Sequence, residues 1–263
     1  MKYALITGAY GGMGLSTVNL LVQNGWTVFA LDKKTEEKKP DIYPITADLT
    51  NHDSISVAFD EVSKITEKLD AIIHFGGIYD LNSLVEIDEK AFEKIFHINV
   101  FGAYYVNKTF LPLLHKGSKI VITTSELAPL DPLPFTGIYA ITKTALEKYA
   151  LSLRMELQLL GISVSIIRPG AVKTNLLGDS TTALDRFCEN TVLYDCNAKK
   201  FRNIVNSVES KNVPSEKIAK LTLKILSKKH PKPIWNINRN PLLRLLNVLP
   251  KRTQAFIIRK ILK

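Results

Sequence analysis

Hydrophobic residues occur along the chain in two alternating patterns: short continuous runs, and longer segments in which apolar positions recur every three or four residues. Continuous runs without polar alternation are typical of strands that are buried on both faces of a parallel sheet. The three-to-four spacing is typical of amphipathic helices. Strands are predicted at residues 3–7, 27–32, 42–46, 69–74, 119–125, 162–168 and 233–235. The alternation predicts an α/β fold with a doubly wound parallel sheet of about seven strands, flanked by helices.

Two of the predicted helices carry polar residues at unusual places. One has Asn99 in its middle, where a side-chain amide competes with the backbone for hydrogen bonds and can bend the helix. Pro112 is expected to kink or end that helix. The other spans residues 137–160 and carries Tyr139 and Lys143, which lie on one face because residues four apart are neighbours on a helix.

The chain is long enough for one large domain. It has 263 residues, of which 46% are hydrophobic, and this is ample for a core. We expect residues 1–237 to form that domain. Residues 175–213 lack strong periodicity and are predicted to form an irregular or partly helical lobe over the substrate site. Residues 238–263 are predicted to form a basic, amphipathic, helical C-terminal extension.

The charge is unevenly distributed along the chain. There are 35 Lys and Arg residues against 25 Asp and Glu, but no acidic residue follows Glu216, whereas residues 217–263 carry 13 Lys and Arg. The first 216 residues are therefore close to neutral. A nearly neutral body argues against nucleic acid as a partner, and the basicity belongs to the C-terminal part.

No run of residues approaches the ~20 apolar positions that a membrane-spanning helix needs. A predicted strand begins at residue 3, which leaves no room for a secretory signal, so we expect a cytoplasmic protein. Cys188 and Cys196 are expected to be reduced thiols and match no metal-binding spacing, so no metal site is predicted.

Two interpretations of the C-terminal extension remain open. Pro250 divides it into two short amphipathic segments, and a basic helix without acidic residues can lie peripherally on an anionic membrane. Alternatively, the helices pack on the body or on a neighbouring subunit, with their lysines in water.

A glycine-rich turn follows the first predicted strand and precedes a helical pattern. Gly8, Gly12 and Gly14 occur in this turn. Glycines let the backbone approach a pyrophosphate, and the helix N-terminus supplies N–H donors and the positive end of the helix dipole. The turn therefore predicts a dinucleotide site on a Rossmann-like fold.

The second predicted strand ends in Asp32. A carboxylate here can accept hydrogen bonds from the ribose hydroxyls and would repel a 2′-phosphate, so it favours NAD over NADP. Lys33 and Lys34 follow directly, and either could bind a phosphate, so NADP remains an alternative.

Tyr139 is the candidate proton carrier. A positive charge at Lys143 is expected to stabilise the phenolate and to lower its pKa from about 10, which would make Tyr139 a general acid and base near neutral pH. Ser125 ends the fifth predicted strand 14 residues before Tyr139, and a proline-rich loop between them could bring the two hydroxyls together.

Taken together, these residues resemble the short-chain dehydrogenase/reductase family over most of the chain, from Lys2 to about Trp235. Thr7-Gly8-x-x-x-Gly12-x-Gly14 is similar to the family's glycine pattern. The resemblance implies a catalytic set of Asn99, Ser125, Tyr139 and Lys143. It also implies cofactor contacts at Gly8, Tyr10, Gly12, Met13, Gly14, Asp32, Asp48, Leu49, Gly76, Gly77, Tyr139, Lys143, Pro169, Gly170, Val172 and Thr174. The family usually carries Asn-Asn-Ala-Gly after the fourth strand, where this chain has His74-Phe75-Gly76-Gly77. We expect His74 to be a packed structural residue rather than a catalytic base.

The family's chemistry implies an NAD(P)-dependent oxidoreductase that transfers a hydride between nicotinamide and an alcohol or carbonyl substrate. Tyr139 would carry the proton, Lys143 would lower its pKa and bind the nicotinamide ribose, and Ser125 would orient the substrate oxygen. Asn99 would hold a water that links Lys143 to solvent. Basic C-terminal extensions in relatives suggest a small lipophilic substrate, such as a steroid, a retinoid or another hydroxy-lipid.

The resemblance also implies a homodimer or homotetramer. The alternative function is a non-catalytic NAD(P)-binding sensor or scaffold on the same fold. The complete catalytic set argues against that alternative, because a protein that only binds the dinucleotide needs no tuned tyrosine.

Overall fold

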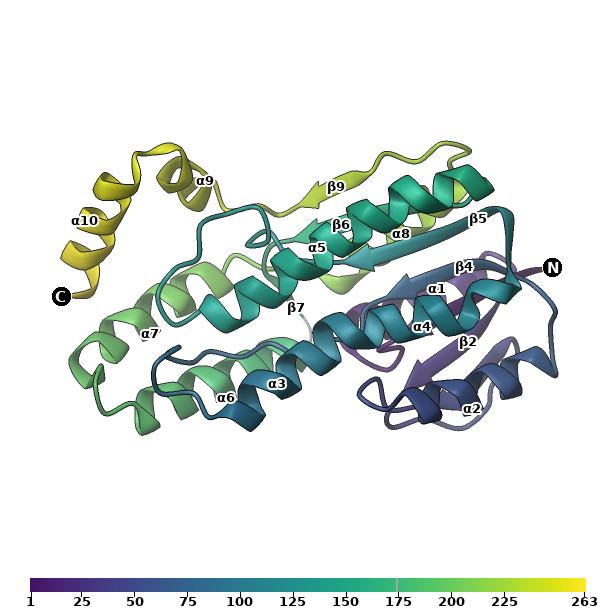
Figure 1. Ribbon diagram of the computed structural model, residues 1–263, viewed down its shortest axis with the longest axis horizontal. Helices are drawn as coiled ribbons and strands as arrows, with labels where there is room; N and C mark the ends of the chain where they lie inside the picture. The colour runs from purple at the N-terminus through teal and green to yellow at the C-terminus, as the bar shows by residue number, and fades with distance from the viewer. Residues whose placement is uncertain (174) are drawn as a thin grey trace.

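The computed structural model describes residues 1–173 and 175–263, and within them seven parallel strands form one sheet in the order β3-β2-β1-β4-β5-β6-β9 (Figure 1). The strands are β1 (Lys2–Thr7), β2 (Trp26–Asp32), β3 (Ile42–Thr46), β4 (Leu69–His74), β5 (Leu114–Thr123), β6 (Ser163–Pro169) and β9 (Ile234–Ile237). The predicted doubly wound parallel sheet is therefore confirmed. The main difference from the predicted ranges is β5, which begins five residues early because its polar first half still pairs with β4 at Leu69.

Helices cover both faces of the sheet, as the continuous apolar strands require. The flanking helices and short turns are α1 (Gly12–Gln23), α2 (His52–Ser63), α3 (Glu89–Phe96), α4 (Gly102–Phe110), η2 (Leu111–Leu113), α5 (Gly137–Leu157), η3 (Gln158–Leu160) and α8 (Ser215–Ser227). Side chains alternate along β1, so that Leu5 packs among α2, α4 and α5, whereas Ala4 and Ile6 pack among α1 and α8. In Figure 1, α4 and α5 cross the front of the sheet. The two apolar clusters hold the layers together.

The strand order reverses at β1. It runs from β1 through β2 to β3 on one side and then returns to β4 on the other side of β1. The Phe75 N–H donates to the Thr7 carbonyl over 3.0 Å, so the two carboxyl ends stay paired beyond the regular strands. Ligands of open α/β sheets bind at this kind of switch point.

The helical stretch that contains Asn99 changes its winding at that residue. A π-helical turn, η1 (His97–Phe101), joins α3 to α4, and the helix gives way to η2 and then β5 around Pro112. The predicted disturbance at Asn99 is confirmed. Single π-turns inside helices frequently mark functional sites.

The segment that the sequence predicts to be irregular or partly helical contains two helices, α6 (Asn175–Asn190) and α7 (Asp195–Glu209). They are flanked by two short paired strands, β7 (Val172–Lys173) and β8 (Val213–Pro214). The periodicity is weak because few apolar residues hold each helix: Phe187 of α6 and Phe201 of α7 pack around Phe135, with Leu81 in the same cluster.

The C-terminal extension forms α9 (Pro241–Val248) and α10 (Lys251–Leu262), and the break at Pro250 is confirmed. Its inner side packs on the body: Leu262 is buried in the cluster of α6 and α7, and the Asn197 amide donates to the Leu262 carbonyl over 2.7 Å. Within the described residues, we find no helix with the length and hydrophobicity needed to cross a membrane. The division of the chain after residue 237 stays a prediction.

Candidate active site

The turn after β1 can be built only from glycine at two positions. Gly8 has φ +65°, and a Cβ on it would lie 2.7 Å from the Gly76 nitrogen. A Cβ on Gly14 would lie 2.0 Å from the Gly8 carbonyl oxygen, because α1 starts directly against the turn. The result is a side-chain-free backbone cradle at a helix N-terminus, which fits an anionic pyrophosphate.

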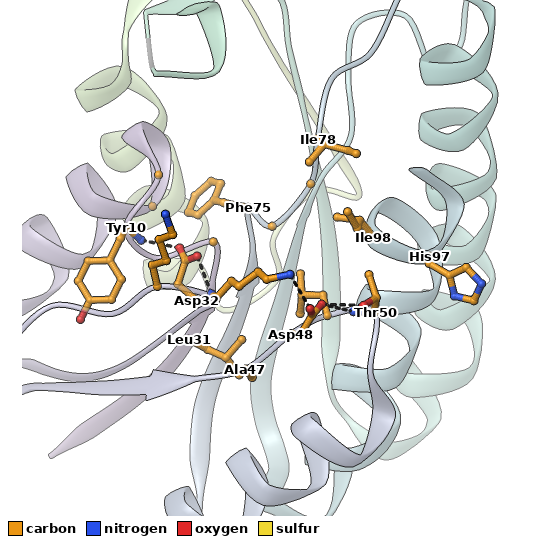
Figure 2. Close-up of a pocket in the computed structure, with 18 of the residues that line it drawn as sticks. Tyr10, Leu31, Asp32, Ala47, Asp48, Thr50, Phe75, Ile78, His97 and Ile98 are labelled. Atoms are coloured by element: carbon orange, nitrogen blue, oxygen red, sulfur yellow. Dashed lines mark hydrogen bonds and ion pairs between the residues drawn. The ribbon is translucent and has the colours of Figure 1, made fainter. Parts of the chain in front are cut away.

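A cavity of about 810 Å³ opens from this cradle along the carboxyl ends of β1, β2 and β4 (Figure 2). It brings together ten of the predicted cofactor residues: Gly8, Tyr10, Gly12, Met13, Gly14, Asp32, Asp48, Leu49, Gly76 and Gly77. Their predicted placement along one cleft agrees with the structure, and their individual contacts with a cofactor stay predictions.

Asp32 is fixed at the end of β2 by its own backbone neighbourhood. Its carboxylate accepts hydrogen bonds from the Tyr10 N–H over 3.0 Å and from the Lys33 N–H over 2.7 Å. Figure 2 shows the carboxylate between Tyr10 and Leu31 at the cavity wall. A negative charge therefore stands where the second strand meets the cleft.

Lys33 forms an ion pair with Asp48 at the wall of the same cavity. Its ammonium lies 2.7 Å from an Asp48 carboxylate oxygen, and Thr50 donates to Asp48 from its backbone N–H and its hydroxyl (Figure 2). These donors hold the pKa of Asp48 at about 2, with the Lys33 hydrogen bond contributing most. Lys33 is thus paired with a carboxylate in this structure, and both Lys33 and Lys34 line the cavity.

A second cavity, of about 200 Å³, continues from the first and holds the predicted chemistry. Met13, Phe75, Gly77 and Ile78 line both cavities. Further predicted site residues line only the second: Ser125, Tyr139, Lys143, Pro169, Gly170 and Val172. Thr174 lies outside the described residues, so its predicted contact is not placed.

Tyr139 is buried beside Ser125, with the Tyr79 ring packed edge-on against it at 4.7 Å between ring centres. Burial raises the pKa of Tyr139 to about 12, and the hydrogen bond with Ser125 acts in the opposite direction. The prediction that Lys143 holds this pKa below its usual value is wrong for this structure. The Lys143 Nζ lies 5.7 Å from the centre of the phenol ring, and desolvation of the phenolate outweighs its influence.

Lys143 is buried on the same helix face, and its Nζ donates to the Thr123 carbonyl over 3.3 Å. Burial lowers the pKa of Lys143 to about 8, because the ammonium has lost most of its water. The lysine therefore titrates close to neutral pH. Such a group can change charge during a proton transfer.

Asn99 is bound on both sides. Its Oδ1 accepts the Ile78 N–H over 2.8 Å, and its Nδ2 donates to the Ile78 carbonyl and to the Thr142 hydroxyl, each over 3.0 Å. The π-turn thus fixes the loop after β4 to the helix that carries Tyr139. No sequence pattern points to Thr142, whose partner Asn99 lies 43 positions away. The predicted water relay through Asn99 stays a prediction.

The departure from the family's Asn-Asn-Ala-Gly has a packing reason. A Cβ on Gly76, where the family has Ala, would lie 2.5 Å from Cδ1 of Leu49. Leu49 therefore occupies the space of the missing methyl group. His74 is buried and its Nε2 is hydrogen-bonded to Oδ1 of Asn107 over 2.9 Å, so its predicted structural role is confirmed.

Sequence reasoning missed Glu126, a buried residue that follows Ser125 and lines the second cavity. Its Oε2 accepts the Asn240 N–H over 2.6 Å, so the residue beside Ser125 holds the start of α9. Burial raises the pKa of Glu126, and the hydrogen bond from Asn240 opposes the shift. An acid directly after a strand-end serine is the only signal the sequence offers.

Within the described residues, no cluster of three or more His, Cys, Asp or Glu side chains could hold a metal ion.

The sequence profile of the short chain dehydrogenase family matches residues 2–185. The chain is 34% identical over 192 residues to estradiol 17-beta-dehydrogenase 2 of Mus musculus, which is 67% of this chain and 50% of that protein. The chain thus spans half the length of this relative. It is 33% identical over 196 residues to the uncharacterized oxidoreductase YbbO of Escherichia coli K12, covering 72% of this chain and 73% of that protein. It is 25% identical over 246 residues to the NADPH-dependent 3-dehydrocapnine reductase of Ornithobacterium rhinotracheale, covering 88% and 86%.

Solved structures share the fold. A short chain dehydrogenase family protein from Francisella tularensis superposes with a TM-score of 0.76 at 25% identity, covering 90% of this chain and 97% of that chain. The NADH complex of 3-ketoacyl-(acyl-carrier-protein) reductase from Brucella melitensis superposes with a TM-score of 0.73 at 19% identity, covering 90% and 96%.

Proposed function

The chain belongs to the short-chain dehydrogenase family of oxidoreductases, and on that premise we propose that it interconverts a small lipophilic alcohol and its carbonyl compound with NAD(H), using Tyr139 as the general acid and base. One observation carries this proposal: Tyr139, Ser125 and Lys143 line a single cavity that continues into the glycine-cradled cleft. A protein that only binds a dinucleotide would not need a buried tyrosine there.

The cleft fits the dinucleotide. The Gly8–Gly14 cradle would hold the pyrophosphate, Asp32 the adenosine ribose, and Lys143 the nicotinamide ribose. Asp32 supports NAD over NADP because a carboxylate opposes a 2′-phosphate, and Lys33 is paired with Asp48 at 2.7 Å. Lys34 at the cavity wall, and a relative named as NADPH-dependent, leave NADP as the alternative. When bound, the nicotinamide supplies or accepts the hydride.

The protein's own groups handle the proton. With a pKa of about 12, the Tyr139 hydroxyl is protonated at neutral pH, so it can donate to a carbonyl oxygen in the reducing direction. The Ser125 hydroxyl, already bonded to Tyr139, can also bind that oxygen and stabilise its developing negative charge. The Lys143 ammonium stabilises the phenolate that remains.

The lining of the catalytic cavity supports a lipophilic substrate. Its walls beyond the catalytic residues are mainly apolar side chains from the loop after β5 and from α7 and α9: Leu127, Leu133, Phe201, Ile204, Val205, Val208 and Leu243. The similarity to estradiol 17-beta-dehydrogenase 2 is consistent with a steroid-like or other hydroxy-lipid substrate. The predicted homodimer or homotetramer remains part of the proposal.

Comparative titration of NADH and NADPH, followed by turnover on a panel of lipophilic ketones and alcohols, tests the proposal. We expect tighter NADH binding and turnover that rises with the apolar area of the substrate. Tight dinucleotide binding without turnover on any member of a broad panel would contradict the proposal that the protein is an enzyme. It would support the alternative of a dinucleotide sensor. Tighter NADPH than NADH binding would overturn the cofactor assignment alone.

A further inference from the structure

Helix α9 has two apolar faces with different surroundings. Leu243 of its inner face lines the catalytic cavity. On the opposite side, Leu242, Leu245 and Val248 expose 68%, 62% and 78% of their surface. With 3.6 residues per turn, a helix whose partners lie on one side should be polar on the other. The outer leucines and valine therefore need an explanation that packing within this chain does not give.

Helix α10 also has an inner side that packs on the body and an exposed outer side, and its outer side carries more basic residues than that of α9. Its inner side is formed by Gln254, Ile258 and Leu262, which face the body. Phe256 lies on the opposite side of the helix and is 66% exposed. The basic residues that share this outer side are Arg252, Arg259, Lys260 and Lys263, all exposed. We name the outer sides of α9 and α10 together the outer face.

The extension is a fixed part of the cavity wall. Glu126 holds its start through the Asn240 N–H over 2.6 Å. The Asn247 amide donates to Asp131 over 2.9 Å, and Lys251 pairs with the same carboxylate. Whatever contacts the outer face is therefore separated from the catalytic cavity by the thickness of one helix.

The charge of the outer face selects its partner. Residues 238–263 contain seven Lys and Arg and no Asp or Glu. A second copy of this chain would oppose like charges across a two-fold interface, which is costly. An anionic lipid surface instead accepts both features, since exposed apolar side chains enter the headgroup boundary while Lys and Arg contact the phosphates.

We propose that the outer face docks on an anionic membrane surface, so that α9 stands between the bilayer and the catalytic cavity. A lipophilic substrate dissolved in the membrane then reaches Tyr139 past α9 without crossing bulk water. The docking itself is independent of the chemistry. The delivery of substrate rests on the proposed function.

Sedimentation of the full chain with vesicles tests the docking. We use vesicles of phosphatidylcholine alone and of phosphatidylcholine with phosphatidylserine, at low and at physiological salt. Two triple variants remove one feature each: Leu242→Ser with Leu245→Ser and Val248→Ser, and Arg252→Gln with Arg259→Gln and Lys260→Gln. The matched control removes three exposed cations of α8 on the body: Lys217→Gln, Lys220→Gln and Lys224→Gln.

We expect the wild-type chain and the α8 control to sediment with the anionic vesicles only, and salt to weaken the binding. Each cation removed from α10 should lower the partition coefficient for anionic vesicles about fivefold. The apolar triple variant should also bind these vesicles more weakly than the wild-type chain. Equal sedimentation of all variants, or none of the wild-type chain, overturns the proposal. So does a wild-type chain that ignores vesicles but loses self-association in the apolar variant, because a second copy would then be the occupant.

Two further readouts separate this inference from the proposed function. A Tyr139→Phe protein must bind the vesicles like wild type, since docking needs no turnover. Given turnover, the variants of the outer face should raise the apparent KM for a ketone dissolved in vesicles and leave the KM for a water-soluble ketone unchanged. An equal change for both substrates would mean that the variants damage the cavity, and it would contradict delivery from the membrane.

Discussion

The Lys143 ammonium and the Asn99 amide both lie close to the Cα of Gly77. A Cβ placed on Gly77 would lie 3.3 Å from Nζ of Lys143 and 3.1 Å from Oδ1 of Asn99. Both side chains are buried and fixed by hydrogen bonds, so neither can move away freely. The last glycine of the loop after β4 therefore sets the spacing of two predicted catalytic residues.

The first prediction concerns Gly77→Ala. The added methyl group should displace Lys143 or Asn99 by a few tenths of an ångström, and such misplacement lowers kcat about tenfold or more. Steady-state kinetics with thermal unfolding as a control will measure it. Wild-type kcat in a folded variant would show that this spacing does not matter to the chemistry.

The second prediction concerns cofactor choice. Asp32→Asn removes the charge that opposes a 2′-phosphate while keeping an acceptor for the Tyr10 N–H, so it should raise the affinity for NADPH relative to NADH by about tenfold or more. Asp60→Asn is the control, because Asp60 is an exposed carboxylate of α2 that does not line the cavity. An unchanged ratio of the two dissociation constants in Asp32→Asn would remove Asp32 from cofactor selection.

The third prediction is a pH profile. Lys143 is charged below its pKa of about 8, and Tyr139 stays protonated up to about 12. The kcat/KM for carbonyl reduction, which reports the free enzyme, should be flat below about pH 8 and fall above it as Lys143 loses its proton. Lys143→Arg should lack this fall, since arginine stays charged. A wild-type profile without a break near pH 8 would contradict the assignment.

The fourth prediction concerns stability in acid. Burial lowers the pKa of His74 to about 4 from 6.5, so between these values the unfolded chain binds a proton that the folded chain does not. The contribution of His74 to the free energy of unfolding is complete above pH 6.5. It is lost as the pH falls to 4, which lowers that free energy by up to about 3 kcal/mol. Urea unfolding of wild type, His74→Gln and the exposed-site control His230→Gln should show this loss in wild type and His230→Gln only. The same slope in His74→Gln would assign it to other groups.

Much of the fold could be predicted because its signals are local. The seven strands are short apolar runs bounded by polar residues, and the Gly8 turn carries its constraint in its own backbone. The helix is disturbed at Asn99 as predicted, but the Asn99 amide bonds to Ile78 and Thr142 rather than to its own helix, so this disturbance also involves distant residues. The motifs also follow one another along the chain in the order found in the family, and this order indicates roles for residues that no single motif indicates.

The rest depends on contacts between distant residues. The sequence predicts only an irregular or partly helical lobe here, because the apolar residues of α6 and α7 are few and pack against distant residues such as Phe135 and Leu262. The contact of Glu126 with Asn240 spans 114 positions. The pKa of Tyr139 shifts upward, opposite to the predicted direction. Burial, which the sequence does not reveal, outweighs a neighbouring charge.

Replacement of Tyr139 by Phe tests the central claim most directly. The change removes one hydroxyl and keeps the ring that packs against Tyr79, so the fold and the dinucleotide affinity should be retained. With the preferred nicotinamide cofactor and the best substrate of the panel, we expect kcat to fall by about a hundredfold or more. A folded Tyr139→Phe protein with near wild-type kcat would contradict the assignment of Tyr139 as the proton carrier.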